Sequence, residues 1–264
     1  GISFYSSYYY LIDSSISAFM KNLFFTLMLF LFAACSQNSS NTVSSFGDFI
    51  KPNYLNLVST MHCRLKPLNS LNSLEKFIPI FVKNFAASNI DDSEVYFYFP
   101  LSIDEKTNTS EFKLVLQHST EASLDNMTQR LDGLEFSQIA DCTQDQPSQN
   151  LARLKKDNFL QTETLLETMT CEYHENYNFA TLNLVFEQLI DALSDVAMAL
   201  EFQYLGTEFS DRTFQWITIF SSAEDRKSFL NHWRSLQVSN EMQALLTEQA
   251  SCNASEVFRA YKVI

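Results

Sequence analysis

Residues 165–173, with the sequence LLETMTCEY, decide the fold because their Met169-Thr170-Cys171 repeats the earlier Met61-His62-Cys63. Each Met-x-Cys pattern ends an apolar run and precedes a short polar turn and a long amphipathic segment. Each is followed, at a similar distance along the chain, by a second cysteine, Cys142 or Cys252. We interpret the chain as one folded unit that occurs twice, each copy with its own cysteine pair.

The second copy has the clearer pattern of strands and helices. Apolar residues recur at helical spacing between residues 178 and 193. Residues 213–220, TFQWITIF, have the aromatic and β-branched content of a strand, and Ser222 is expected to cap the helix that follows. The predicted order is strand 165–173, helix 178–193, strand 196–205, strand 213–220, helix 223–236, short helix 241–249 and strand 256–263.

The first copy matches the second element by element. Residues 112–119, FKLVLQHS, align without gaps on residues 214–221, FQWITIFS. Pro79 lies inside the first helix and is expected to shorten or kink it. The predicted order is strand 57–64, helix 74–86, strand 94–99, strand 112–118, helix 123–131, short helix 134–139 and strand 151–155.

The order β-α-β-β-α-β is that of the ferredoxin-like split motif. Its sheets have apolar residues on both faces, as in residues 214–220, so the face without helices must also be buried. The chain from residue 51 onward therefore resembles the dimeric α+β barrel superfamily. The resemblance implies an α+β fold of two tandem ferredoxin-like (βαββαβ) units, residues 51–160 and 161–264, packed sheet to sheet as a pseudo-dimeric barrel in a monomeric protein. Relatives of that architecture include cofactor-poor monooxygenases, haem-degrading enzymes, isomerases and members without known activity.

The N-terminal region is expected to direct the protein to the cell envelope. Residues 1–19 look like a non-native upstream segment, with Met20 as the true start. From Met20 a lysine and the apolar residues 23–32 form the pattern of a secretory signal, too short for a bilayer, which takes about 20 apolar residues. The following Phe-Ala-Ala-Cys resembles the lipobox of bacterial lipoproteins, which implies a signal at residues 20–35 and lipidation of Cys35. Ordinary cleavage after Ala34 is the alternative.

The resemblance to lipoproteins also implies a location. A serine after the lipidated cysteine implies the periplasmic face of the outer membrane, where a multi-chain lipid anchor holds stably. Residues 36–50 are largely Ser- and Asn-rich and are expected to form a flexible tether between the anchor and the fold.

The other four cysteines are expected to form disulfides, because an exported protein folds in an oxidising compartment. Four cysteines permit three connectivities, and the repeat favours Cys63–Cys142 and Cys171–Cys252. A metal site is the competing interpretation, but the chain has no CxxC motif to support it. We therefore expect no metal.

The charge and glycine content exclude several classes of function. The net charge of −13 without a compensating Lys/Arg cluster argues against nucleic-acid binding. The four glycines are too dispersed for a GxGxxG or GxxxxGK[ST] phosphate loop. The chain also lacks a GxSxG nucleophile elbow and an HExxH zinc motif.

Candidate site residues lie on the face between the predicted sheets. Glu201 and Gln203 interrupt an apolar strand, and a carboxylate buried there could act as a general base because its pKa would be raised. The alternative is that both face solvent at the barrel rim. Weak catalytic candidates are Glu201, His118 and His232, and weak ligand-binding candidates are Tyr96, Tyr98, Glu201, Gln203 and Trp216.

The sequence favours a lipid-anchored envelope protein without catalytic activity, which binds a small apolar ligand or a protein partner. The first alternative is a cofactor-poor monooxygenase or haem-type enzyme of the dimeric α+β barrel class. The second is a purely structural envelope component. No cofactor is expected, although haem is not excluded.

Overall fold

The computed structural model describes residues 50–86, 93–101, 110–144, 148–155, 157, 159, 162–194, 198–207 and 210–263. The expected upstream segment, signal, lipidated Cys35 and all but the last residue of the tether lie outside these residues. The described residues belong to one compact unit, Phe46–Ile264. None of its described helices combines the length and apolarity that a membrane span requires.

The elements follow the predicted order in both halves of the chain. The first half comprises β1 (Tyr54–Leu65), α2 (Leu71–Ala86), β2 (Glu94–Pro100), β3 (Glu111–His118), α3 (Glu121–Gly133), η2 (Phe136–Gln138), β4 (Ala140–Thr143) and β5 (Gln149–Lys155). The second comprises β6 (Glu163–Tyr173), α4 (Phe179–Ala192), β7 (Leu200–Thr207), β8 (Ser210–Phe220), α5 (Ala223–Ser235), α6 (Ser239–Gln249), β9 (Ala250–Cys252) and β10 (Glu256–Lys262). The short strands β4 and β9 were not predicted.

Local capping explains where several helices begin. Ser222 caps α5 as predicted, because its hydroxyl accepts a hydrogen bond from the Asp225 N–H at 3.1 Å. Asn178 and Thr181 form a reciprocal capping box at the start of α4. The expectation that Pro79 shortens its helix was wrong, since α2 continues through Pro79 to Ala86.

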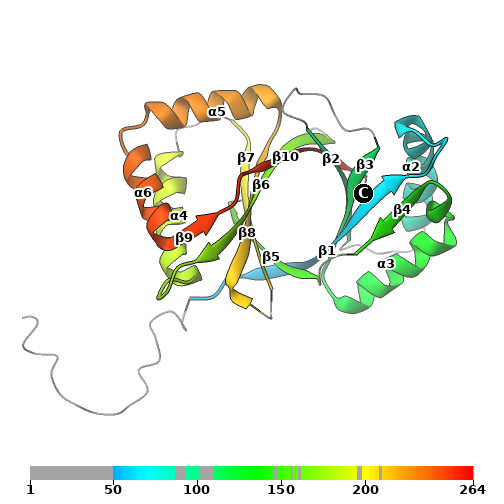
Figure 1. The fold of residues 1–264 in the computed structure, drawn as a ribbon, viewed down its shortest axis with the longest axis horizontal. Helices are drawn as coiled ribbons and strands as arrows, with labels where there is room; N and C mark the ends of the chain where they lie inside the picture. The colour runs from blue at the N-terminus through cyan, green and yellow to red at the C-terminus, as the bar shows by residue number, and fades with distance from the viewer. Residues whose placement is uncertain are drawn as a thin grey trace, which may run out of the picture. The chain divides into compact units, whose positions relative to one another are not determined.

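Eight of the ten strands in the described residues close into a barrel (Figure 1). The first half contributes the strand order β2-β3-β1-β5 and the second β7-β8-β6-β10. Antiparallel ladders between β5 and β7 and between β10 and β2 join the halves. The predicted packing of two sheets face to face is therefore corrected. The edge strands of the two halves hydrogen-bond to each other, which satisfies backbone groups that two stacked sheets would leave unpaired.

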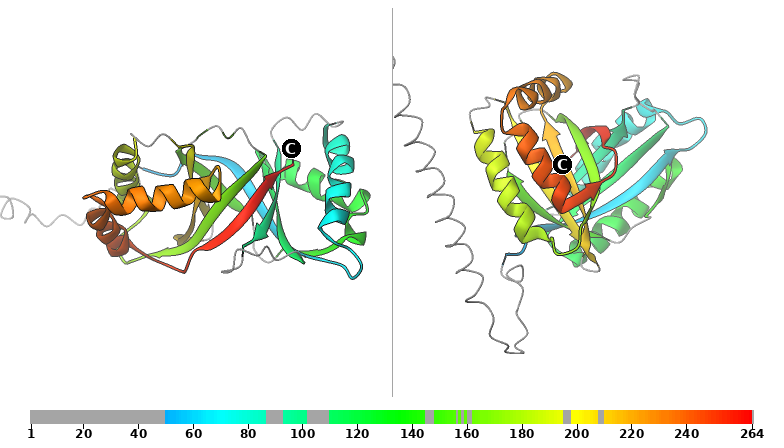
Figure 2. Two further views of the ribbon diagram at one scale, coloured as in Figure 1. Left: turned by 90° about the horizontal axis from the view of Figure 1, so that it is seen from above. Right: turned by 60° about the vertical axis from the view of Figure 1, so that its left-hand side comes forward.

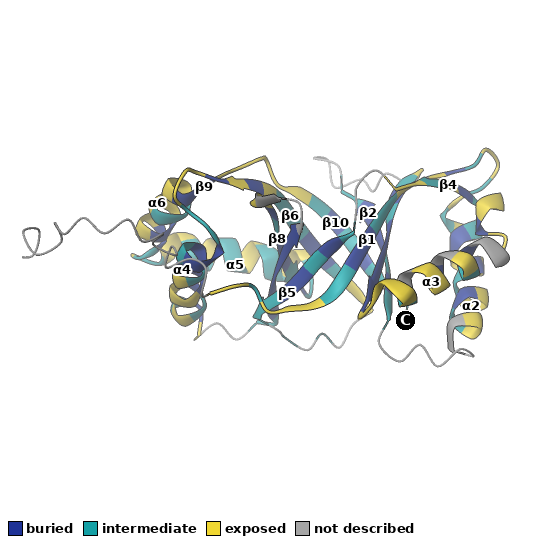
Figure 3. Ribbon diagram, turned by 90° about the horizontal axis from the view of Figure 1, so that it is seen from below, coloured by how far each residue is buried: buried dark blue, intermediate teal, exposed yellow. Residues whose placement is uncertain are grey.

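Helices cover the outside of the barrel on two opposite sides, α4, α5 and α6 over the second half and α2 and α3 over the first (Figures 1 and 2). Side chains alternate along each strand between the helices and the barrel interior. Three clusters of buried apolar side chains result, one beneath each helix layer and one inside the barrel. The helices α2, α3, α4 and α6 accordingly bury one face and expose the other (Figure 3), whereas α5 has no fully buried residue.

Both predicted disulfides are present and link facing residues on neighbouring strands. Cys63 of β1 stands opposite Cys142 of β4, and Cys171 of β6 stands opposite Cys252 of β9, each with a Cα–Cα distance of 4.0 Å. Cys142 lies before β5, the last strand of its half, and within β4, a short strand that was not predicted and that pairs with the end of β1.

Candidate functional site

The barrel interior holds a charged network toward one end and a cavity toward the other, and Gln117 and Gln203 belong to both. The structure places Glu201 and Gln203 of β7 inside the barrel, where both are buried. Tyr98 belongs to the apolar cluster in the middle of the interior, and Tyr96 packs against that cluster. The face of β7 that carries Glu201 and Gln203 thus points into the barrel, as the sequence predicted. The alternative, that both residues face solvent at the barrel rim, was wrong.

Arg153 is the centre of the charged end, and the sequence reasoning missed it. Its Nε donates to Glu201 at 3.2 Å, and its Nη2 donates to Glu94 at 3.1 Å and to Gln117 at 3.2 Å. Gln203 also donates to Glu201, at 2.6 Å. Arg153 sits in the predicted strand 151–155 between the apolar residues Ala152 and Leu154, so a cation flanked by apolar residues was the available signal.

The network extends from Glu94 to further partners. Lys262 donates to Glu94 at 2.7 Å and the Tyr96 hydroxyl donates at 2.9 Å. Burial alone would raise the pKa of Glu94, but the hydrogen bonds from Lys262 and Tyr96 and the charge of Arg153 outweigh it and lower that pKa. Burial and nearby carboxylates raise the pKa of both Tyr96 and Tyr98, which remain neutral. Glu201 is therefore a carboxylate held by Arg153 and Gln203 inside the barrel, not the isolated buried base that we predicted.

A cavity of about 270 Å³ occupies the other end of the barrel interior. Apolar and polar side chains both line it, and Gln203 is among them whereas Glu201 is not. The apolar lining residues are Val58, Tyr98, Val115, Leu166, Leu205, Ile217, Ala254 and Phe258, and the polar ones include Thr60, His62, Lys113, Gln149, Thr168, Gln215 and Glu256.

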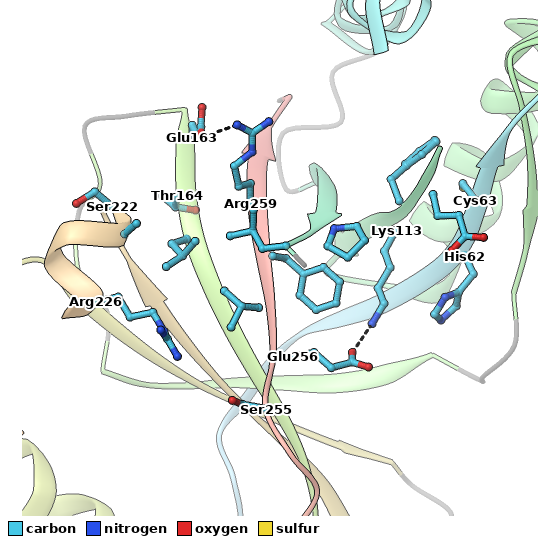
Figure 4. A pocket seen from close by; sticks show the side chains of 18 of the residues that line it. His62, Cys63, Lys113, Glu163, Thr164, Ser222, Arg226, Ser255, Glu256 and Arg259 are labelled. Carbon is cyan, nitrogen blue, oxygen red and sulfur yellow. Dashed lines mark hydrogen bonds and ion pairs between the residues drawn. The ribbon is translucent and has the colours of Figure 1, made fainter. Parts of the chain in front are cut away.

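A larger groove of about 1820 Å³ lies beside this end of the barrel, between α5 and the ends of β1 and β3 (Figure 4). Its floor includes residues of β10 and β6, such as Arg259 and Glu163. Basic side chains predominate among the charged residues that line it. They are Arg64, Lys66, Lys113, Arg226, Lys227, Arg234 and Arg259, against the acidic Glu111, Asp141, Glu163 and Glu256.

Four residues line both the cavity and the groove, and we call them the mouth: His62, Lys113, Glu256 and Phe258. Lys113 Nζ pairs with Glu256 at 3.2 Å and lies 4.4 Å from the centroid of the Phe258 ring. His62 stands opposite Lys113 in the β1–β3 ladder. Figure 4 shows Lys113 extended toward Glu256 across the space between their strands.

The remaining predicted residues lie elsewhere. Trp216 faces the helices, packed against Phe186 with ring centroids 3.8 Å apart and hydrogen-bonded to Thr218, so it lines neither cavity nor groove. His118 is fully buried at the end of β3, and His232 lies on α5; neither lines the cavity or the groove. The structure thus brings together Tyr96, Tyr98, Glu201 and Gln203 and separates Trp216, His118 and His232 from them.

Comparison with known proteins agrees with this architecture. No family model matches the chain, and no curated protein matches it by sequence. Solved structures do match, among them a protein provisionally named a monooxygenase from Fusobacterium nucleatum, with a TM-score of 0.54, 10% identity and coverage of 80% of this chain and 94% of that one. A variant of the chlorite dismutase from Candidatus Nitrospira defluvii has a TM-score of 0.52, 6% identity and coverage of 80% and 93%. A haem-binding protein from Thermus thermophilus has a TM-score of 0.50, 8% identity and the same coverage.

Identities this low show that the fold is shared and carry no information about activity. The chain is an α+β protein with an eight-stranded barrel of the kind found in these proteins.

Proposed function

We propose that this protein binds a small amphipathic organic molecule in the cavity inside its barrel. The observation that carries the proposal is a cavity of about 270 Å³ lined by both apolar residues and a larger number of polar ones. Ligand pockets combine apolar walls, which hold the ligand, with polar groups that orient it, and this cavity offers both. The volume lies just below the ~300–1,000 Å³ typical of drug-sized ligands, which favours a small molecule.

Calorimetric titration with 1-octanol tests the proposal, because this probe has a slender apolar tail and a polar end. We expect saturable binding of one molecule per chain. Thr168 lines the cavity and is half-buried, so Thr168→Phe would fill the space and abolish binding. Gln243→Phe, on the exposed face of α6, is the matched control and should bind as the wild type does. Unchanged binding to folded Thr168→Phe would exclude the cavity as the site.

We further propose that each half is a ferredoxin-like unit and that the barrel is an internal pseudo-dimer. The element order of each half and the corresponding strand orders, β2-β3-β1-β5 and β7-β8-β6-β10, support this. On this proposal a monomer already contains a complete barrel. Light scattering that gave the mass of one chain would support the proposal, and an obligate dimer would count against it.

Oxygenase chemistry on the bound molecule is the second candidate function. The provisional name of the Fusobacterium nucleatum protein favours it. Tyr98, His62 and Lys113 are the protonatable groups of the cavity lining that could act on a substrate. The test is aerobic incubation with 1-naphthol and related phenols, followed by mass spectrometry for incorporated oxygen. Products that disappear in Thr168→Phe would establish the activity.

The described residues do not fit a haem. Haem needs an axial ligand, such as histidine, and a pocket whose polarity and access suit it. Both helix-to-sheet layers are filled by buried side chains, and the barrel cavity is smaller than the pockets of drug-sized ligands. The groove is large enough, but seven cations and four carboxylates line it, and its histidine, His62, is exposed. Haem titration with His62→Ala as control tests this: a stoichiometric Soret band lost in that variant would contradict us.

We also propose that the protein is anchored at the cell envelope through lipidated Cys35. The motif Phe-Ala-Ala-Cys after an apolar segment supports the proposal. Mass spectrometry of the protein from membranes should detect an acylated N-terminal cysteine, and Cys35→Ser should release the protein from the membrane fraction. An unmodified Cys35 would rule out the anchor without affecting the proposal on the cavity.

A further inference from the structure

We infer that the ligand of the barrel is an organic anion, whose apolar tail enters the cavity and whose acidic group, a carboxylate or a phosphate, binds Lys113 and the basic groove beside it. The inference rests on the proposed function and adds the chemical class of the ligand. Three features carry it: the geometry of the mouth, the weak hold on Lys113, and the charge of the groove.

The mouth borders both spaces at the point where β2 departs from β3. The β2–β3 ladder ends at Tyr98 and Lys113, while β2 stays bonded to β10 as far as Leu101, whose N–H donates to the Val257 carbonyl at 2.8 Å. Within the described residues, the side chains of Lys113 and Glu256 bridge β3 and β10 at this point. Because these two residues line both cavity and groove, a ligand in the cavity that extended outward would pass them.

Lys113 is suited to hold an anion because its own partner is easily replaced. The Lys113 side chain is 23% exposed, whereas Glu256 is 65% exposed and therefore well hydrated. An ion pair with such an exposed partner contributes little. A ligand carboxylate could take the place of the Glu256 carboxylate at Lys113 Nζ, and Glu256 would then turn into solvent. The ligand tail would meanwhile contact the apolar lining around Phe258.

The charge of the groove favours the same class of ligand. The whole chain has more acidic than basic residues, 31 Asp and Glu against 18 Lys and Arg. The groove reverses this balance, with seven Lys and Arg and four Asp and Glu in its lining. Five of the seven cations are in ion pairs, so the positive excess of the groove comes mainly from Lys227 and Arg234. Such an excess in an acidic protein attracts anions to this part of the surface. Without it, the net charge of −13 would repel them.

Several of these cations retain unused hydrogen-bonding capacity. Lys227 and Arg234, seven residues apart on α5, form no ion pair within the part of the chain that the structure describes. Arg259 lies on the floor with its Nη1 3.9 Å from Glu163, and its buried Nε has no hydrogen-bond partner. Buried donors without partners are rare in folded proteins, and an anion in the groove could satisfy this one.

The experiment compares three probes with the same tail: 1-octanol, octanoate and octyl phosphate. Calorimetry on the whole folded chain at neutral pH should show both anions binding about tenfold or more tightly than octanol, as expected for a charge-assisted contact. Added salt should weaken binding of the anions and leave octanol unchanged. Which anion binds more tightly distinguishes a carboxylate from a phosphate ligand.

Two variants of the mouth should act in opposite directions. Lys113→Met keeps the aliphatic stem and should weaken octanoate about tenfold without affecting octanol. Glu256→Gln removes the competitor for Lys113 and should tighten octanoate about threefold. Lys76→Met, at an exposed position on α2, is the matched control and should change neither probe. If Lys113 and Glu256 had only a structural role, both variants would weaken every probe.

The outcomes separate this inference from the proposed function. Octanol that binds as tightly as both anions, or octanoate that binds Lys113→Met as well as wild type, would overturn the anion inference and leave the cavity proposal standing. Failure of all three probes to bind would overturn both.

Discussion

Arg153 on β5 donates through Nε to Glu201 on β7 at 3.2 Å, and this pair links the two halves of the chain inside the barrel. Both side chains are largely buried, with 14% and 7% of their surface exposed. Without Arg153, the Glu201 carboxylate could have served as a base. The ion pair holds it in the charged network instead, and the cavity at the other end of the interior is available for a ligand.

Removing one member of this pair should destabilise the fold. Among the described residues, Arg153→Met leaves the buried Glu201 with only Gln203 as a partner, and breaking a buried ion pair costs about 3–5 kcal/mol. The free energy of unfolding from urea titration measures this loss. Lys66→Met is the control, because the Lys66–Asp141 pair is exposed and should contribute less than about 1 kcal/mol. The double variant Arg153→Met/Glu201→Leu should cost less than the sum of its single changes; simple additivity would show that the pair is not coupled.

The two disulfides should contribute equally to stability. They close loops of nearly the same sequence separation, 79 and 81 residues, for which the chain-entropy model gives about 4 kcal/mol each. The double variant Cys63→Ala/Cys142→Ala should therefore lower the free energy of unfolding about as much as the double variant Cys171→Ala/Cys252→Ala. A peptide map under non-reducing conditions that linked Cys63 to Cys171 would contradict the arrangement.

Much of the fold could be predicted from the repeat, because the pattern that defines each strand and helix lies within a short stretch of sequence. Each strand and helix has a periodicity that does not depend on distant residues, and Met61-His62-Cys63 and Met169-Thr170-Cys171 fix the alignment of the halves. How the halves join could not be predicted, because the β5–β7 and β10–β2 ladders pair strands far apart in sequence. The inward face of β7 was predictable from alternation, but the partner of Glu201 was not, since Arg153 meets it only when the barrel closes.

Trp216 illustrates a wrong prediction with a measurable consequence. Because it packs against Phe186 and Phe202 beneath the helices, Trp216→Ala should cost about 3–5 kcal/mol of stability. Since Trp216 does not line the cavity, the milder Trp216→Phe should leave the affinity for 1-octanol unchanged. Calorimetry on folded Trp216→Phe checks this, and a large loss of affinity would return Trp216 to the binding site.

His118 should make the stability of the protein depend on pH below neutrality. It is fully buried, and its ring nitrogens form no hydrogen bond of good geometry within the described residues. Burial lowers its pKa below the ordinary value of 6.5, although the neighbouring Thr120 backbone and the charge of Asp125 oppose this. As pH falls below 6.5, the unfolded chain takes up a proton that the folded protein does not, so stability is lost between 6.5 and the lower folded pKa. The loss is at most about 1.4 kcal/mol per pH unit for one proton.

His118→Leu tests this dependence directly. The variant should be at least as stable as the wild type at neutral pH, because it removes two buried ring nitrogens that form no hydrogen bond of good geometry within the described residues. It should also lose less stability than the wild type when urea titrations are repeated at stepwise lower pH. His232→Gln, on α5, controls for the removal of a histidine elsewhere and should follow the wild type. The depressed pKa of Glu94 acts in a separate window, since stability that depends on its charge is lost only as pH falls below about 4.5. If His118→Leu and wild type lost stability in parallel above that window, His118 would not be the titrating group.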